Sequence, residues 1–270
     1  MKPKGIRMNP LESKALAWSQ LTKRRVVRTG ELIKILGISS KQEEKLLIKM
    51  TKSGLVIRLM RGLYLLPGTI PTAPWSPSEY FLLSILMEEI KAEYQVTGLA
   101  AFNFHQLSTQ VPNQLTVYNT KLSGRKKIGT AILNFIKVNT SRIGAYERLE
   151  VKDFATSRCA NISSLARTMM DAVYDYKSFT SLPDAYDWIR GKAHDDKFLK
   201  EFISVVLEFS NVATRRRIGY FLESIKANPR LVNKIYKSLD ETSSFIPMIP
   251  GISSTGQINR KWGVKINGRI

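Results

Sequence analysis

The chain contains very few of the residues that build disulfide frameworks and metal centres. Among its 270 residues are one cysteine, Cys159, and two histidines, His105 and His194. A lone cysteine excludes an internal disulfide and a cysteine-cluster metal site, and the two histidines are too distant in sequence for a metal-binding motif. We therefore expect no metal and no cofactor. We expect Cys159 to be a small buried apolar side chain and His105 a hydrogen-bonded structural residue.

Long apolar segments are missing as well. The longest apolar runs, such as residues 81–87, are interrupted by Ser84 and fall far short of the roughly 20 residues that span a bilayer. Residues 1–10 are basic but have no apolar core, so no secretion signal is predicted. These absences predict a soluble protein of a reducing compartment, and we expect it in the cytoplasm.

Acidic residues are also scarce. The chain has 22 Asp and Glu against 42 Lys and Arg, so its net charge is +20. With 43% hydrophobic residues it has an ordinary globular composition, so the excess charge belongs to a folded protein. Such a basic chain favours a polyanion as its partner. Residues 1–75 hold 15 of the basic and 4 of the acidic residues, so over half of the excess lies near the N-terminus.

A cluster of prolines marks a boundary near residue 75. Four of the chain's 11 prolines lie at positions 67, 71, 74 and 77. Proline restricts its own backbone and favours extended geometry at the preceding residue, so this stretch is typical of a linker. Ser76 as N-cap, followed by Pro77 and Glu79, predicts the start of a helix over 78–92. We predict one domain of residues 1–75 and a second of residues 76–270.

The first domain has the pattern of a winged helix-turn-helix. Apolar spacing and turn residues predict helices over 10–22, from Thr29 to Gly37 and over 40–53, then extended segments at 55–60 and 63–66. Thr29 is the expected N-cap of the second helix, and Ser40 with Glu43 the expected capping box of the third. In such modules the second helix of the pair enters the major groove of DNA.

The outward side of helix 40–53 is the predicted DNA-reading surface. Lys41, Lys45 and Lys49 are spaced to lie along one helix face, and Gln42 can pair with a base edge. Two arginines of the following hairpin are expected near phosphates or the minor groove. The full set of predicted DNA contacts is Arg28, Thr29, Ser39, Ser40, Lys41, Gln42, Lys45, Lys49, Lys52, Arg58 and Arg61. Two alternatives stay open: a lysine face that is merely solvated, and a winged helix that docks a protein.

The second domain is predicted to be a larger mixed α/β domain with a helical C-terminal part, which makes the whole chain α+β. Strands are expected at 94–97, 115–119, 133–138, 150–156 and 159–162. Helices are expected at 99–106, 163–176, 184–192, 196–209, 211–226 and 228–239, with extended chain around 245–246 and 262–266.

An acid-free stretch predicts a second basic surface. No Asp or Glu occurs between Glu93 and Glu147. The candidate residues of this surface are Lys121, Arg125, Lys126 and Lys127, and the alternative is a solvated loop beside a strand. In the arginine run 215–217 we expect at least one side chain to pair with an acid such as Glu208 or Glu223.

No catalytic motif is recognisable. The sequence has no Gly-rich phosphate loop, no G-x-S-x-G and no H-E-x-x-H, and segment 251–254 lacks the second glycine of a nucleophile elbow. Glu150 and Lys152 have the E-x-K spacing of metal-dependent nucleases, which need a second carboxylate on a preceding strand. Residues 94–146 contain no carboxylate. We expect no enzyme activity and keep a Mg²⁺-dependent nuclease as an alternative.

Six segments resemble, in the same order, those of the abortive-infection type IV antitoxins (AbiEi-like). They are residues 61–67, 97–102, 105–112, 162–171, 213–223 and 260–264. Their order across nearly the whole chain carries the resemblance. One departure is segment 164–167, which reads Ser-Leu-Ala-Arg where family members often have Pro-Glu-Arg-Ala. In this chain Arg167 and Asp171 are expected to form a structural i,i+4 pair.

The resemblance implies a two-part antitoxin of a phage-defence toxin-antitoxin system. Its winged helix would bind inverted repeats in its own promoter and repress the operon. The larger domain would counteract a nucleotidyltransferase-type toxin encoded beside it, by direct contact or otherwise. Inverted repeats can be bound by a dimer or by two monomers that meet on DNA. The alternatives are a stand-alone winged-helix regulator without a toxin partner and a protein-docking adaptor.

Overall fold

The computed structural model describes residues 8–71, 73–153, 156–241, 243–252 and 255–268. Most of the N-terminal stretch in which we predicted no secretion signal, and the two serines of segment 251–254, lie outside the described residues. The chain forms two compact units. The first unit consists of residues 1–93, 121–135 and 148–160, and the second of residues 94–120, 136–147 and 161–270. The division at residue 75 stays a prediction.

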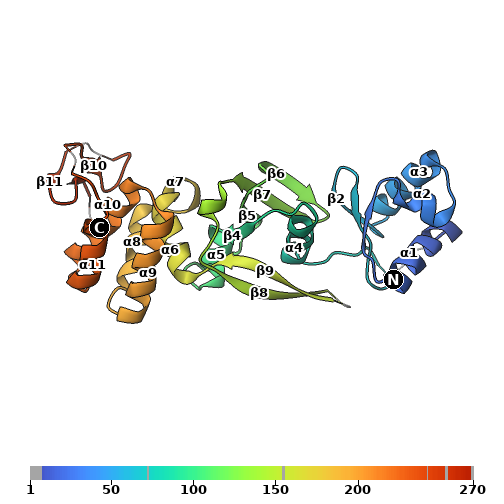
Figure 1. The fold of residues 1–270 in the computed structure, drawn as a ribbon, viewed down its shortest axis with the longest axis horizontal. Coiled ribbons are helices and arrows are strands. Elements are labelled where there is room, and N and C mark those ends of the chain that lie inside the picture. Colours follow the sequence, from blue (N-terminus) through green and yellow to red (C-terminus); the bar gives the residue numbers. More distant parts are fainter. Residues whose placement is uncertain (1–7, 72, 154–155, 242, 253–254, 269–270) are drawn as a thin grey trace. The chain divides into compact units, whose positions relative to one another are not determined.

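The N-terminal part of the first unit contains three helices and a three-stranded sheet (Figure 1). The elements are α1 (Pro10–Thr22), β1 (Val26–Arg28), α2 (Glu31–Leu36), α3 (Ser40–Lys52), β2 (Ile57–Met60) and β3 (Leu63–Leu65). Strand β3 pairs antiparallel with both β1 and β2. The predicted helices, and the extended segments around the Arg-Gly turn, are confirmed. Gly62 occupies that turn with φ 75°, a conformation that glycine adopts without steric cost.

The core of this part comes from one face of each helix. Leu16 of α1, Leu32 of α2, and Leu47 and Met50 of α3 are all buried in one cluster. In α3 the buried positions recur three and four residues apart, which is the spacing of one helical face. Because that face is used for packing, the basic residues of the same helix lie on its exposed side.

The helix starts differ from the predicted caps. Helix α3 is capped by Ser39, whose side chain accepts a hydrogen bond from the backbone N–H of Gln42, and not by Ser40 with Glu43. Helix α2 begins after Gly30, with φ 95°, and not after Thr29. The reason is Glu43, which is buried and turned toward α2. Its carboxylate accepts hydrogen bonds from the N–H groups of Gly30 (2.8 Å) and Leu32 (2.9 Å) and so takes the place of a local cap.

The strands of the described residues form three sheets, with the orders β1-β3-β2, β6-β7-β5-β4-β9-β8 and β10-β12-β11. The members of the six-stranded sheet are β4 (Tyr94–Thr97), β5 (Leu115–Asn119), β6 (Gly124–Ile128), β7 (Ala131–Lys137), β8 (Tyr146–Asp153) and β9 (Thr156–Ser163). The predicted strands at 94–97 and 115–119 are confirmed. The strand predicted at 150–156 instead begins at Tyr146, and residues 154–155 lie outside the described chain.

Two elements of the first unit correct the sequence predictions. Residues Gly124–Ile128 form strand β6 in an antiparallel hairpin with β7, so the alternative of a solvated loop is wrong for Arg125, Lys126 and Lys127. Helix α4 (Glu79–Glu89) is capped by Ser78, whose hydroxyl accepts from the N–H of Phe81, and not by Ser76. Ser78 is extended, with ψ 150°, so the helix starts later than predicted. The Ser76 hydroxyl instead hydrogen-bonds to that of Thr130 (2.8 Å).

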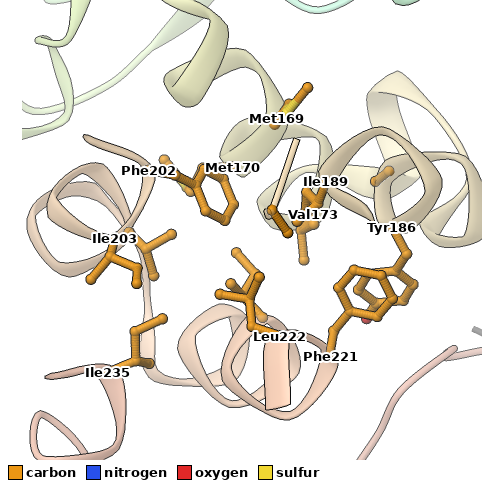
Figure 2. Close-up of a cluster of buried hydrophobic side chains, with 14 of the residues drawn as sticks. Met169, Met170, Val173, Tyr186, Ile189, Phe202, Ile203, Phe221, Leu222 and Ile235 are labelled. Atoms are coloured by element: carbon orange, nitrogen blue, oxygen red, sulfur yellow. The ribbon is translucent and has the colours of Figure 1, made fainter. Parts of the chain in front are cut away.

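The C-terminal part of the second unit is mainly helical. Its helices are α6 (Leu165–Tyr174), α7 (Tyr176–Phe179), α8 (Leu182–Arg190), α9 (Asp196–Phe209), α10 (Val212–Ser224) and α11 (Pro229–Tyr236), and α5 (Leu99–Phe104) precedes them in the chain. Figure 2 shows side chains of α6, α8, α9, α10 and α11 converging on one apolar core. Tyr186 and Phe221 stack there with 4.7 Å between ring centres. The predicted helix over 196–209 is confirmed to the residue.

A tight contact joins α10 to the C-terminal strands β10 (Ile246–Pro247), β11 (Gln257–Asn259) and β12 (Val264–Ile266). The Trp262 ring is buried against Gly219 of α10, where an added Cβ would lie 2.0 Å from the ring carbon Cζ3. Only glycine leaves room for the ring at this helical position. Strand β11, which pairs with β12, was not predicted. Among the described residues, no helix is long and apolar enough to cross a bilayer.

Candidate nucleic-acid interface

Helix α3 presents a row of exposed basic side chains. Lys41, Lys45, Lys49 and Lys52 are exposed, as is Gln42, while the opposite face of the helix is buried. The predicted separation into a packing face and a basic face is therefore present in the structure. Within the described chain, Lys41, Lys45 and Lys52 form no ion pair, so their charges are available to a ligand.

Gln42 and Ser39 are partly engaged by the helix itself. The Gln42 side-chain oxygen accepts a hydrogen bond from the Ser39 N–H (2.8 Å), and the Ser39 hydroxyl accepts one from the Gln42 N–H (3.3 Å). This reciprocal pair is a capping box, which satisfies two N–H groups at the start of the helix. The cap uses the oxygen of the Gln42 amide and leaves its NH₂ group to donate to a base acceptor.

Lys49 differs from the other lysines of α3. Its ammonium lies 3.0 Å from the Glu12 carboxylate, which is only 1% exposed, while the Lys49 side chain remains 58% exposed. Lys49 is therefore part of the contact between α3 and α1. A substitution at this position would leave a buried carboxylate without its cation, so its effect on DNA binding cannot be separated from its effect on folding.

The β2–β3 hairpin carries two further cations of the predicted set. Arg58 is exposed on β2, and Arg61 is exposed at the turn. Two other residues of the predicted set have partners within the protein. The Thr29 N–H donates to the Gly62 carbonyl (3.0 Å), and the Arg28 guanidinium pairs with Glu89 of α4 (2.9 Å). Ser40, in the first turn of α3, is exposed.

The secondary basic surface lies on β6. Arg125, Lys126 and Lys127 are all exposed, and of the five residues of this strand only Ile128 is buried. Lys121 precedes the strand, and its ammonium donates to the backbone carbonyl of Ile90 (2.5 Å). Because successive side chains of a strand point to opposite faces, Arg125 and Lys127 lie on one face of β6 and Lys126 on the other.

Arg25, which sequence reasoning did not select, joins the N-terminal helices to the end of β8. Its guanidinium pairs with Asp153 (2.7 Å) and donates to the Leu66 carbonyl (3.2 Å). Asp153 also accepts from the indole N–H of Trp75 (3.1 Å), and the guanidinium lies 5.2 Å from the centre of that ring. No local pattern signals these contacts, because the partners are far apart in sequence.

The arginine run of α10 contacts backbone carbonyls. Arg215 donates to Leu207 (2.6 Å) and Arg217 to Pro247 (3.1 Å). The predicted pairing with Glu208 or Glu223 is wrong, since Glu223 instead accepts from Lys261 and from the Trp262 indole. Arg216 and Arg217 are buried, so these arginines hold the helical core together and do not form a surface for a polyanion.

The predicted Arg167–Asp171 pair is confirmed and belongs to a buried network of the second unit. Arg167 and Asp171 are fully buried, with 3.0 Å between Nε and Oδ2, and Arg142 also contacts Asp171. The hydroxyl of Tyr118 donates to Asp175. Burial raises the pKa of the Asp175 carboxyl, and the neighbouring Asp171 adds to the rise. These side chains contact one another and the backbone, so their role in the fold is structural.

The residues considered for catalysis are not gathered into a site. Glu150 is exposed, accepts from the Ser157 hydroxyl (2.6 Å) and pairs with Lys152 (3.5 Å). The parts of the chain that the structure describes contain no group of three or more His, Cys, Asp or Glu able to hold a metal ion. Cys159 is exposed on β9, so its predicted burial is wrong. His105 hydrogen-bonds to the Ser163 carbonyl (2.7 Å), as expected of a structural histidine.

Comparison with known proteins identifies one family and a shared fold. Residues 19–67 match the family model described as "Transcriptional regulator, AbiEi antitoxin", which confirms the resemblance over this segment. The protein RV2827C from Mycobacterium tuberculosis has a similar crystal structure, with a TM-score of 0.60 and 13% identity over 97% of this chain and 94% of that one. At this identity the similarity shows the fold alone. No curated protein matches the chain.

Proposed function

We propose that this chain, which carries an AbiEi antitoxin regulator segment at residues 19–67, is a DNA-binding antitoxin of a type IV toxin-antitoxin system. The observation that supports this most directly is that the family match and the exposed basic face of α3 lie in the same segment. The matched segment includes α2, α3 and the β2–β3 hairpin, and this is the part of the chain in which an exposed row of cations lies opposite a buried helix face. Helix-turn-helix proteins place such a helix in the major groove.

Each element has a separate role in this proposal. Helix α3 enters the major groove, where the Gln42 NH₂ group donates to a base and the lysines contact phosphates. The β2–β3 hairpin acts as the wing, with Arg58 and Arg61 against the backbone or minor groove. Arg28 at the end of β1, Thr29 after it, and Ser39 and Ser40 at the start of α3 complete the predicted contact set. The protein acts in the cytoplasm, where its DNA is.

The first experiment measures the salt dependence of binding to the promoter upstream of the gene. If about six phosphates are contacted per chain, log affinity falls against log salt concentration with a slope near −5. Replacing Lys41, Lys45 and Lys52 by glutamine is expected to make the slope less negative by about 2 to 3, since each lost phosphate contact removes about 0.9. Lys49 is left intact because it pairs with the buried Glu12.

The matched control replaces Lys192, Lys197 and Lys200 by glutamine. These three lysines are exposed in the second unit, so the control removes the same charge from a surface without a proposed role. Equal slopes for the two variants would contradict the assignment of α3. A wild-type chain that binds no promoter fragment at any salt concentration would contradict DNA binding altogether.

We further propose that the chain represses its own operon through inverted repeats and counteracts a nucleotidyltransferase-type toxin encoded beside it. A reporter fused to the promoter is expected to be repressed by the wild-type chain and released by the Lys41, Lys45 and Lys52 variant. Expression of the neighbouring reading frame is expected to arrest growth, and co-expression of this chain to restore it. Repression without such rescue would favour the stand-alone regulator.

A further inference from the structure

A groove beside α3 is bordered by cations from three separate elements. It has a volume of about 530 Å³, and its lining includes Lys52 at the end of α3, Arg58 on β2 and Lys127 on β6. The described residues that line it include no Asp or Glu. All three cations are exposed, and they come from positions up to 75 residues apart in sequence. The fold therefore gathers positive charge at a site that no single motif defines.

Specific contacts hold the β6–β7 hairpin against this groove. At the hairpin turn, a Cβ built on Gly129 would lie 3.5 Å from Cγ2 of Ile57, so the turn packs on β2. The neighbouring Thr130 hydroxyl bonds to Ser76. On the other side, the backbone N–H of Trp75 donates to the Gly54 carbonyl (3.0 Å), which ties the linker to the end of α3. The groove is thus built from packed elements, which fix the backbone positions of its cations.

We propose that β6 is a second element for binding the DNA backbone, and that this groove receives a phosphodiester next to the site of α3. The inference rests on the proposed function and extends it to a part of the chain outside the family match. Lys52, Arg58 and Lys127 surround the phosphate, and Arg125, which lies on the same face of β6 as Lys127, contacts a neighbouring phosphate of the same DNA strand. Such contacts carry no sequence information, but they set the register of a protein on its duplex.

The composition of the groove favours a sugar-phosphate backbone. Its lining includes the apolar side chains of Ile57 and Trp75, both largely buried, together with the three exposed cations. A nucleic-acid backbone has the same division, since anionic oxygens alternate with sugars that have apolar faces. The hydroxyl groups of Ser76 and Thr130, which also line the groove, are further donors of the kind that contact phosphates.

The test uses the full chain, the promoter site as a minimal duplex, and duplexes extended in either direction. The β6 variant replaces Arg125, Lys126 and Lys127 by glutamine; the control is the Lys192, Lys197 and Lys200 variant described above. We expect the wild type to gain affinity when the duplex is extended on one side only. The β6 variant is expected to lose this gain and to have a salt slope less negative by about 2, since Arg125 and Lys127 each contribute about 0.9. Thermal unfolding of all variants checks that the fold is kept.

Ethylation of single phosphates locates the contact. Ethyl groups that weaken wild-type binding beyond the site of α3 are expected to have no effect on the β6 variant. A chain with the single change Lys127→Arg, which keeps the charge, is expected to retain the wild-type pattern. If the β6 variant equals the control on every duplex while the α3 variant is impaired, the second contact is overturned and the proposed function stands. If the wild type binds no duplex, both are overturned. The inference is also overturned if an acidic polypeptide binds the β6 surface in competition experiments and extended DNA does not.

Discussion

The Arg25 guanidinium and the Asp153 carboxylate form a buried ion pair across 128 positions of sequence, with 2.7 Å between Nη2 and Oδ2. Their side chains are 10% and 4% exposed. Removing one partner of such a pair leaves an uncompensated buried charge, which costs about 3–5 kcal/mol. We expect Asp153→Asn to lower the free energy of unfolding by about this amount in urea denaturation.

Glu150 provides the control, because it is an exposed carboxylate on the same strand. Glu150→Gln is expected to change the free energy of unfolding by less than about 0.5 kcal/mol. A loss below about 1 kcal/mol for Asp153→Asn would show that the pair adds little to the fold. Replacing both partners by apolar residues, Arg25→Met with Asp153→Leu, is expected to recover much of the loss.

Gln42→Ala is expected to weaken the preference for the promoter site over unrelated DNA. A good contact between an amide and a base edge contributes about 1–3 kcal/mol of discrimination. Thermal unfolding of Gln42→Ala and of Ser39→Ala, which breaks the same capping box, measures the part of the change that comes from the helix cap. Competition between specific and unrelated duplexes measures the ratio. An equal loss of affinity on every sequence after Gln42→Ala would mean that Gln42 does not read bases.

Gly219→Ala is expected to destabilise the chain although alanine is the better helix former. Intrinsic propensity favours alanine by about 1 kcal/mol, but its Cβ would lie 2.0 Å from the buried Trp262 ring. Overpacking of a core costs about 1–3 kcal/mol, so the sign of the change decides between the two effects. At Gly191 an added Cβ meets its nearest atom at 3.5 Å, and Gly191→Ala is expected to be nearly neutral. Urea unfolding followed by tryptophan fluorescence measures both.

The Asp175 carboxyl predicts a specific pH dependence. Burial raises its pKa in the folded chain, so folding favours the protonated form. Its contribution to stability is therefore fully present below the pKa of an unfolded aspartate, about 4, and is lost as pH rises through the folded value. We expect Asp175→Asn to remove this decline from a series of urea titrations, and Asp240→Asn, at an exposed aspartate, to preserve it. Superimposable curves for wild type and Asp175→Asn would contradict the assignment.

Much of the fold could be predicted because local patterns decide it. The helix over 196–209 alternates apolar and polar residues with the period of a helix, and Asp195 caps its start. The sequence of strand β6 shows no hydrophobic periodicity. Four of its five residues are exposed, so it has neither the alternation of a half-buried strand nor the apolar run of a buried one. Its pairing with β7 is what makes it a strand.

The candidate site was predictable only in part, for a related reason. The lysine face of α3 follows from helical spacing, which the sequence displays directly. The contacts of Lys49 with Glu12, and of Arg25 with Asp153, depend on which elements meet in the folded chain. The same holds for Glu43, which local rules assigned to its own helix and which caps the helix before it.

The hydrogen bonds of Glu43 also bear on the proposed binding of DNA. Glu43 belongs to α3 but holds the first amides of α2, so the two helices cannot change their angle without breaking two charge-assisted hydrogen bonds. Under the proposed function, α2 and α3 are held at one angle before a duplex is bound, so little conformational entropy is lost on binding. Adaptation to the operator then falls to the nucleic acid. Operators whose central steps bend easily are expected to be bound more tightly than stiff ones with identical contacted bases.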